Sequence, residues 1–273
     1  MNKSSPEGDY LDEKFQSALI GDHSIYFYAS SIGKHEVLFS NLKVGLNKRC
    51  SALYIASGES IEHVKAEMRS SGLNLDNPNK LKIVTSQQWY LPDGEFHAKR
   101  VIEQFRSLID ESVDRGFEGL YVSGDVADTF DYLSSDLTPL LEYEASLGRT
   151  LNLSMEAICA YRTDQVTSNN HVLPQLIQAH KNTITPKTGN VLDNRTLYID
   201  TFTEALNDIL GEHATEVIFY HVEKLLNISR DQFSDRMEDL EKSLESIFGK
   251  DASKFMMEKI LNDLDGKVEL VVE

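Results

Sequence analysis

The sequence has few cysteines and prolines, a single tryptophan and no long hydrophobic run. No stretch approaches the roughly 18 apolar residues that a membrane-spanning helix needs. The polar first twelve residues contain no apolar core of a signal peptide. Cys50 and Cys159 lie far apart in apolar, strand-like runs, which favours two buried free thiols in a reducing compartment. We therefore expect a cytoplasmic protein with no membrane partner.

Basic residues are also in the minority. The chain has 44 acidic and 27 basic side chains, which leaves a net charge of −17. The excess is concentrated in residues 200–273, where 18 acidic and 8 basic side chains leave a net charge of −10. Such a segment repels a phosphate backbone, which argues against direct binding of nucleic acid. The same charge suits solubility, or docking to a basic partner surface.

The spacings typical of metal and catalytic sites are missing too. The eight histidines form no HxH or HExxH pattern, and no pair of neighbouring cysteines accompanies them. Ser123 and Gly124 lie outside a G-x-S-x-G nucleophile elbow. Glu142 and Glu144, on a predicted helix, fit a solvated helix face about as well as a site. The sequence therefore predicts no metal site, no catalytic residue and no working enzyme.

Short apolar runs alternate with amphipathic stretches through the first 180 residues. The runs predict strands at 24–29, 51–56, 81–84, 120–122 and 151–160. The stretches predict helices at 36–46, 60–70, 95–115 and 136–147, and residues 171–179 close the series. Strands that alternate with helices form βαβ units. The predicted fold class is therefore α/β, with a mostly parallel sheet and helices on both faces.

The pattern changes after residue 181. Residues 182–194 have little periodicity and contain Pro186 and Gly189, which predicts a linker or an irregular edge. Helices are then predicted at 202–210, 214–228 and 252–264, and another opens with the capping box Ser229–Gln232 and ends at Gly249. The residues predicted to face inward are Val217, Ile218, Val222, Leu225, Leu226, Phe233, Met237, Leu240, Leu244, Ile247, Phe255, Met256, Ile260 and Leu261.

These patterns divide the chain into four parts. They are a flexible N-terminal segment (1–15), an α/β domain (16–181), a linker or edge segment (182–199) and a small acidic, all-helical bundle (200–273). A bundle of this size is marginal alone, so we expect it to pack on the α/β domain or on a second subunit.

The turn after the first predicted strand is where a nucleotide-binding α/β domain carries its phosphate loop. Gly33 and Lys34 stand where a P-loop has its Gly-Lys pair. Tyr28 replaces the first glycine, and His35 replaces the hydroxyl residue that binds magnesium. A complete Mg-nucleotide site is therefore not expected. The candidate ligand-binding residues of this turn are Tyr28, Ser30, Ser31, Gly33 and Lys34.

Two further strand ends carry candidate residues. Asp125 and Asp128 follow the fourth strand, next to Gly124, where acids either bind magnesium or take capping and turn roles; capping and turn roles are the favoured interpretation. Residues 90–94 form a turn ahead of the long helix. Trp89 and Tyr90 are the aromatic residues expected near a ligand, with simple core packing as the alternative.

The order of these pieces resembles the MEDS domain, the sensory domain of methanogen and methylotroph regulators that include the dichloromethane-metabolism repressor. The resemblance spans about His23 to His180. The pieces that carry it are His23, the strand 26–28, the helix end Gly45–Leu46, the strand 53–55, the turn 90–94 and the segments 116–120, 141–144, 158–161 and His180. It implies a RecA-like or KaiC-like core without a functional Walker A sequence, which senses small ligands such as hydrocarbon derivatives. By position, it implies ligand contacts from His23, Tyr28, Gly124, Asp125, Glu144 and Tyr161.

Family members usually sit beside a DNA-binding or kinase module, whereas this chain carries an acidic helical segment similar to small helical domains of archaeal proteins. We therefore expect a signalling protein that binds a small ligand at the carboxyl ends of the strands and relays it through the helical module. A nucleotide is the candidate cofactor, and a protein signalling partner and a homo-oligomer are expected. The alternatives are a KaiC-like ATP-binding protein or weak ATPase that uses Lys34 and Asp125, and a ligand-free scaffold.

Overall fold

The computed structural model describes residues 22–150, 154–169, 172–185, 191–233 and 236–272. The chain divides into two compact units, one formed by the residues up to Val191 and the other by Leu192–Val271. The segment 1–15, predicted to be flexible, lies outside the described residues. None of the helices in these ranges is both long enough and apolar enough to cross a lipid bilayer.

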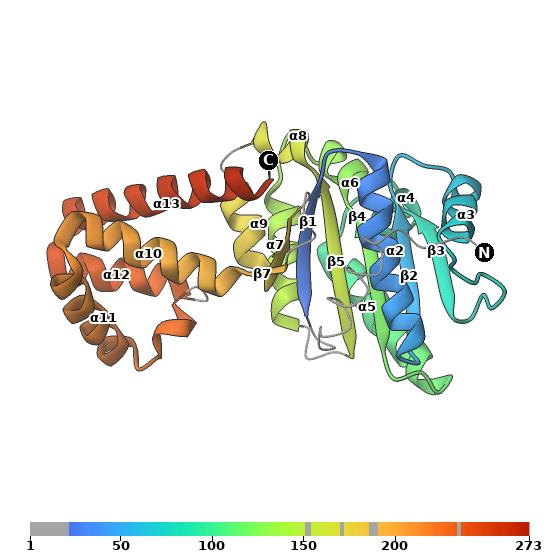
Figure 1. Cartoon of the computed structure of the whole chain (residues 1–273), viewed down its shortest axis with the longest axis horizontal. Helices are drawn as coiled ribbons and strands as arrows, with labels where there is room; N and C mark the ends of the chain where they lie inside the picture. The colour runs from blue at the N-terminus through green and yellow to red at the C-terminus, as the bar shows by residue number, and fades with distance from the viewer. Residues whose placement is uncertain (1–21, 151–153, 170–171, 186–190, 234–235, 273) are drawn as a thin grey trace. The chain divides into compact units, whose positions relative to one another are not determined.

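The strands join in one seven-stranded sheet. They are β1 (His23–Tyr28), β2 (Ser51–Ala56), β3 (Leu81–Thr85), β4 (Leu120–Asp125), β5 (Met155–Arg162), β6 (Asn182–Ile184) and β7 (Val191–Asp193). Their order across the sheet is β3-β2-β4-β5-β1-β6-β7 (Figure 1). Strand β1 pairs in parallel with β5 and β6, β2 with β3 and β4, and β4 with β5. The prediction of a mostly parallel α/β sheet is confirmed.

Helices cover both faces of this sheet (Figure 1). On one face, α2 (Ser31–Asn47) and α3 (Ile61–Ser70) share an apolar core with sheet residues that include Tyr26, Tyr54 and Ile158. On the other, α5 (Ala98–Asp114) packs on α7 (Thr138–Thr150), which packs on α9 (Leu173–Ala179). Three short helices, α4 (Ser86–Tyr90), α6 (Ala127–Tyr132) and α8 (Thr163–Thr167), follow directly after β3, β4 and β5.

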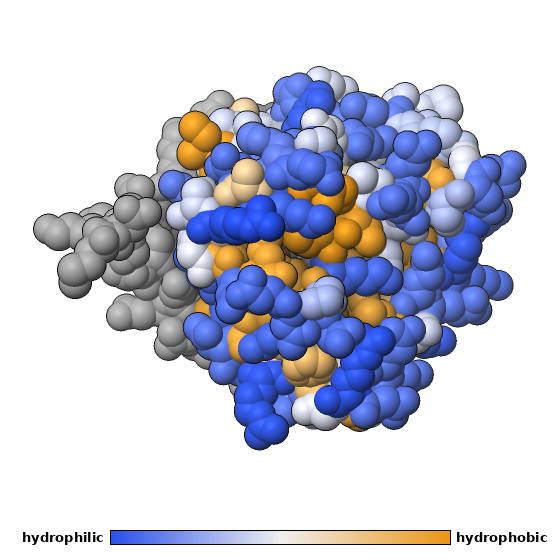
Figure 2. Space-filling model, turned by 90° about the vertical axis from the view of Figure 1, so that its right-hand side faces the viewer, coloured by the Kyte–Doolittle hydropathy of each residue, from blue (hydrophilic) through white to orange (hydrophobic). Residues whose placement is uncertain are grey.

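The burial of the strands explains why the sequence reveals them. Strands β1, β2 and β4 are buried at every position, as expected where helices cover both faces of a sheet. Strand β3, at the edge, is only partly buried. The surface on the side of α3 and β3 is mainly hydrophilic, with a limited apolar area near its centre (Figure 2). A strand buried on both faces is largely apolar, so its sequence contains a short continuous apolar run.

Some boundaries differ from the prediction. Helix α2 begins at Ser31, ahead of the predicted residue 36, because the Ser30 Oγ caps it and accepts a hydrogen bond from the Gly33 N–H at 3.4 Å. Residues 182–194 contain β6 and β7, which are too short to show a period.

The second unit is helical, as predicted. It contains α10 (Asn194–Leu210), α11 (Glu212–Leu226), α12 (Met237–Phe248) and α13 (Lys250–Val272). Helix α10 begins earlier than predicted because Asp193 caps it, accepting hydrogen bonds from the N–H groups of Arg195 and Thr196 at 2.9 and 3.2 Å. The predicted capping box of Ser229 and Gln232 forms, but it opens only the 3₁₀ turn η1 (Arg230–Gln232).

The core of this second unit contains most of the residues predicted to face inward, among them Ile218, Val222, Leu240, Leu244 and Ile260. Five others are exposed: Val217, Leu225, Ile247, Phe255 and Leu261. Each lies next to or near a buried apolar neighbour in the sequence, so the helical period alone assigned too wide an apolar stripe to these helices.

Helix α2 approaches β4 very closely at Gly45. A Cβ atom at this position would lie 2.2 Å from the Tyr121 Cγ and 2.5 Å from its Cβ. The residue is therefore required to be glycine, because the ring occupies the space of any side chain. At Gly33, in the first turn of the same helix, the nearest atom to such a Cβ would be the Tyr26 Oη at 3.4 Å, an ordinary contact.

We expect Gly45→Ala to lower the free energy of unfolding by about 3 kcal/mol, because the added methyl forces α2 away from the sheet. Urea denaturation followed by circular dichroism measures it. Gly33→Ala is the matched control in the same helix, with an expected change of less than about 1 kcal/mol. Equal effects of the two substitutions would contradict the close packing at Gly45.

Tyr121 also contacts an acidic residue of β5. The Glu156 carboxyl is buried and shares a hydrogen bond with the Tyr121 side chain. Burial raises the pKa of Glu156 to about 7, against the opposing effects of Tyr121 and Lys48. The folded state therefore retains the Glu156 proton between the ordinary carboxyl pKa of 4.5 and about pH 7, a range in which the unfolded state loses it.

Stability should accordingly fall as pH rises through this range. Glu156→Gln removes the titrating group, so the wild type should lose about 2–3 kcal/mol relative to this variant between about pH 5 and about pH 8. Urea denaturation of both proteins at the two pH values measures the difference. A pH-independent difference would show that Glu156 titrates normally in the folded state.

Candidate functional site

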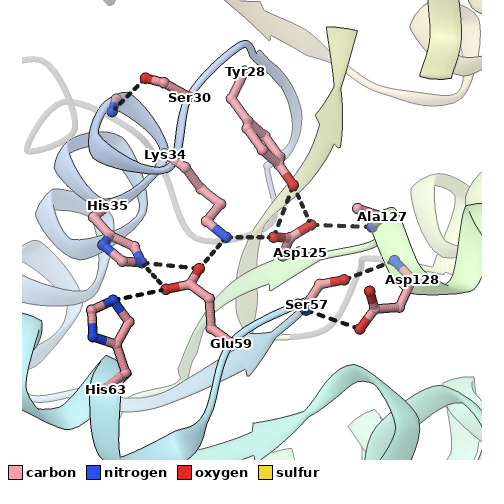
Figure 3. Close-up of polar contacts among 12 residues, drawn as sticks. Tyr28, Ser30, Lys34, His35, Ser57, Glu59, His63, Asp125, Ala127 and Asp128 are labelled. Atoms are coloured by element: carbon pink, nitrogen blue, oxygen red, sulfur yellow. Dashed lines mark hydrogen bonds and ion pairs between the residues drawn. The ribbon is translucent and has the colours of Figure 1, made fainter. Parts of the chain in front are cut away.

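A network of ionic side chains lies at the carboxyl ends of β1, β2 and β4 (Figure 3). We call Tyr28, Lys34, His35, Glu59 and Asp125 the Lys34 cluster. Tyr28 ends β1, Lys34 and His35 come from the first turns of α2, Glu59 lies in the loop after β2, and Asp125 ends β4. Parallel strands bring their carboxyl ends to one edge of the sheet, which is why these distant segments meet.

Lys34 is at the centre of the cluster and is almost fully buried. Its Nζ donates to the Asp125 Oδ2 at 2.8 Å and to the Glu59 carboxylate, and it lies 5.3 Å from the centre of the Tyr28 ring. Burial alone would lower the pKa of Lys34, but the two carboxylates outweigh it and raise the pKa. The ammonium group therefore stays charged, with two acidic partners.

Asp125 is completely buried. Besides Lys34, it accepts hydrogen bonds from the Tyr28 hydroxyl at 3.0 and 3.1 Å and from the Ala127 N–H at 3.1 Å. Burial raises the pKa of Asp125, while Lys34 and these two donors oppose the rise. The hydrogen bond from the Ala127 N–H, at the start of α6, is the kind of turn contact that the sequence favoured over magnesium binding. Asp128 instead accepts from the Gly58 N–H at 3.0 Å.

Glu59 was not among the predicted site residues. Its carboxylate contacts the His35 Nε2 at 3.0 and 3.2 Å and lies 3.7 Å from the Nε2 of the exposed His63. Burial would raise the pKa of Glu59, but the hydrogen bonds from His35 and Lys34 lower it to about 2. The sequence does carry a signal, because Glu59 follows a buried strand and precedes Ser60, the cap of α3.

The connection from β1 to α2 consists only of Ala29 and Ser30. A P-loop has four residues between its two glycines, all available to surround phosphate. Here two of the four residues between Tyr28 and Gly33 already belong to the helix. Ser30 and Ser31 are exposed at this point, while Tyr28 is buried against Asp125.

The aromatic candidates pack against other aromatic residues. Trp89 is buried, and its ring centre lies 5.0 Å from that of Phe105. This agrees with the alternative that Trp89 packs in the core. Tyr90 is buried beside Tyr143. A Cβ atom at Gly124 would lie 3.0 Å from the Tyr90 Oη, so the glycine leaves room for this hydroxyl.

Three predicted site residues belong to a second buried group. His23, Glu144 and Tyr161 lie on the sheet face that α7 covers, together with Cys159 and His180. The side chains along a strand alternate between faces, so His23 at the start of β1 and Tyr28 at its end point to opposite sides. The structure therefore divides the predicted residues between two separate sites.

Residues 22–181 match the family described as MEDS, the methanogen/methylotroph, DcmR sensory domain. The chain belongs to the MEDS family. The match covers more than half of the chain and includes both the Lys34 cluster and the second buried group. No curated protein matches the chain. The description of the family as a sensory domain is consistent with a role in signalling.

We expect Lys34→Met to destabilise the MEDS domain by about 3–5 kcal/mol, because it leaves the Asp125 carboxylate buried without its cation. The double variant Lys34→Met/Asp125→Asn should recover much of this loss, since it removes both charges. Urea denaturation of both variants and of each single variant gives the coupling energy.

The exposed His63 supplies the control. His63→Ala should change stability by less than about 0.5 kcal/mol. Additive effects of the Lys34 and Asp125 substitutions would contradict a coupled buried pair.

Proposed function

We propose that the MEDS domain is a sensor whose small ligand binds beside the Lys34 cluster. Two facts support the proposal: the family consists of sensory domains, and ligands of open α/β sheets bind at the carboxyl ends of the strands. The observation that carries it is the ionic contact of Lys34 with both Asp125 and Glu59, which joins three separate segments at this edge.

The two carboxylates hold Lys34 unequally. Asp125 is fully buried and has two further donors, whereas the Glu59 side chain is 12% exposed and lies in a loop. A ligand that offers a hydrogen-bond acceptor would compete with Glu59 for the Lys34 ammonium. Displacement of Glu59 would release the loop after β2 and the contacts of His35 and His63 with it. The proposed signal is therefore a change in the conformation of the loop after β2.

A nucleotide is the less favoured ligand. The short β1–α2 connection and the buried Tyr28 leave no glycine loop of the kind that surrounds a triphosphate. The KaiC-like core and the ATPase activity that goes with it are the rival hypothesis. It predicts magnesium-dependent ATP hydrolysis that Lys34→Ala abolishes.

The helical unit is the proposed output module, in a cytoplasmic protein whose two cysteines are free thiols. Its apolar exposed side chains include Val217, Tyr220 and Leu225 on α11 and Phe255 on α13. Together with the net negative charge of residues 200–273, they suit contact with a protein partner or with a second copy of the chain.

A thermal-shift panel tests the proposal. Small carboxylates, alcohols and aldehydes are compared with ATP, ADP and their magnesium complexes. We expect at least one small polar compound to raise Tm progressively with its concentration, equivalent to about 2.7 kcal/mol at a hundredfold excess over Kd. The effect should disappear in Lys34→Met/Asp125→Asn, which lacks the ammonium, and persist in His63→Ala.

A flat response to every compound would argue for the ligand-free scaffold. A response confined to Mg·ATP, with hydrolysis lost in Lys34→Ala, would establish the rival hypothesis instead.

A further inference from the structure

Four side chains from distant parts of the MEDS domain meet in its interior. His23 begins β1, Glu144 lies on α7, Cys159 lies on β5, and His180 follows the end of α9. All four are buried, and each offers one potential ligand atom within 4.8 Å of the other three. We call them the His-Cys cluster. It lies on the opposite face of the sheet from the Lys34 cluster and shares no residue with it.

The distances between the potential ligand atoms match the edges of a tetrahedron around a metal ion. The His23 Nε2 lies 3.3 Å from the Cys159 Sγ and 3.3 Å from the Glu144 Oε2. The His180 Nε2 lies 3.5 Å from the same Glu144 oxygen. A tetrahedral zinc ion with bonds of about 2.0–2.3 Å places its ligand atoms about 3.3–3.8 Å apart.

The contacts around the cluster orient its ligands. The His180 Nδ1 lies 2.6 Å from the Leu176 carbonyl oxygen, which can only accept, so Nδ1 carries the proton and donates it. The His180 Nε2 therefore presents a lone pair toward the Glu144 Oε2, which is also an acceptor when ionised. Two acceptors at 3.5 Å repel each other unless a proton or a cation lies between them. Tyr161 donates to the other carboxylate oxygen, Oε1.

This arrangement is the one expected around a metal. Imidazole ligands commonly donate their second N–H to a backbone carbonyl, and ligating carboxylates accept further hydrogen bonds. Burial lowers the pKa of His23 and His180 to about 3, so both rings are neutral, the form that binds metals. Burial also raises the pKa of Glu144 and of Cys159, so an ion that binds here must displace their protons.

We propose that His23, Glu144, Cys159 and His180 bind one divalent transition-metal ion of the zinc type through two imidazoles, one carboxylate and one thiolate. The thiolate and imidazoles disfavour Mg²⁺ and Ca²⁺, which prefer oxygen ligands. Four protein ligands close a tetrahedral site, so the ion would hold β1, β5, α7 and the end of α9 together and have no position for a substrate. Binding to the protonated site releases the thiol proton and the carboxyl proton to solvent.

Cobalt titration of the full chain tests the proposal. Protein stripped with a chelator is titrated with Co²⁺, and absorption spectroscopy follows thiolate-to-cobalt charge transfer and the d–d bands of tetrahedral Co²⁺. We expect one equivalent to saturate both signals, and one equivalent of Zn²⁺ to abolish them. Zn²⁺ should also raise Tm.

Cys159→Ser and Cys50→Ser form a matched pair, because both cysteines are buried free thiols and only Cys159 belongs to the His-Cys cluster. Cys159→Ser should lose the charge-transfer band, whereas Cys50→Ser should keep it. Glu144→Gln, which preserves the shape of the side chain, should weaken Zn²⁺ affinity more than tenfold and keeps the test valid if Cys159→Ser does not fold.

The absence of a tetrahedral Co²⁺ signal in the wild type would overturn the proposal. A signal unchanged in both Cys159→Ser and Glu144→Gln would also overturn it, because the metal would then bind elsewhere on the chain. These readouts are independent of any ligand at the Lys34 cluster.

Discussion

Strand β1 is hydrogen-bonded in parallel to β5 on one side and to β6 on the other, and all its side chains are buried. Because successive side chains point to opposite faces, this single strand contributes one residue to each of the two buried clusters of the MEDS domain. His23 at its start faces α7, and Tyr28 at its end faces α2. A shift of β1 by one residue would exchange the two faces and remove both groups together.

The Lys34 cluster and the His-Cys cluster differ in the charges of their side chains. Near Lys34, one buried cation faces two carboxylates, so negative charge exceeds positive charge among these three groups, and one of the carboxylates, Glu59, remains partly exposed. A group of this kind suits exchange of one partner for a ligand. In the His-Cys cluster, neutral rings surround a carboxyl and a thiol, and no side chain of the cluster supplies positive charge. Such a group suits a cation.

The proposed roles of the two groups are compatible. A metal ion between β1, β5, α7 and α9 would make the interior of the domain rigid, while the loop after β2 stays free to respond. A rigid scaffold next to a movable loop suits a binding site whose ligand changes the conformation of that loop. Neither role requires hydrolysis, although weak ATPase activity remains the rival hypothesis at Lys34.

The sequence alone determined the alternating strands and helices, the acidic helical unit and the family resemblance, because these depend on local periodicity and on residues close in the chain. It also identified Lys34, in the first turn of the helix after β1, and Asp125, at the end of β4. Only the tertiary structure showed that Glu59 contacts Lys34. It also showed that His23 lies next to Cys159, 136 positions away in the sequence. No spacing rule covers ligands from four separate segments, since their proximity depends on strand order and helix packing.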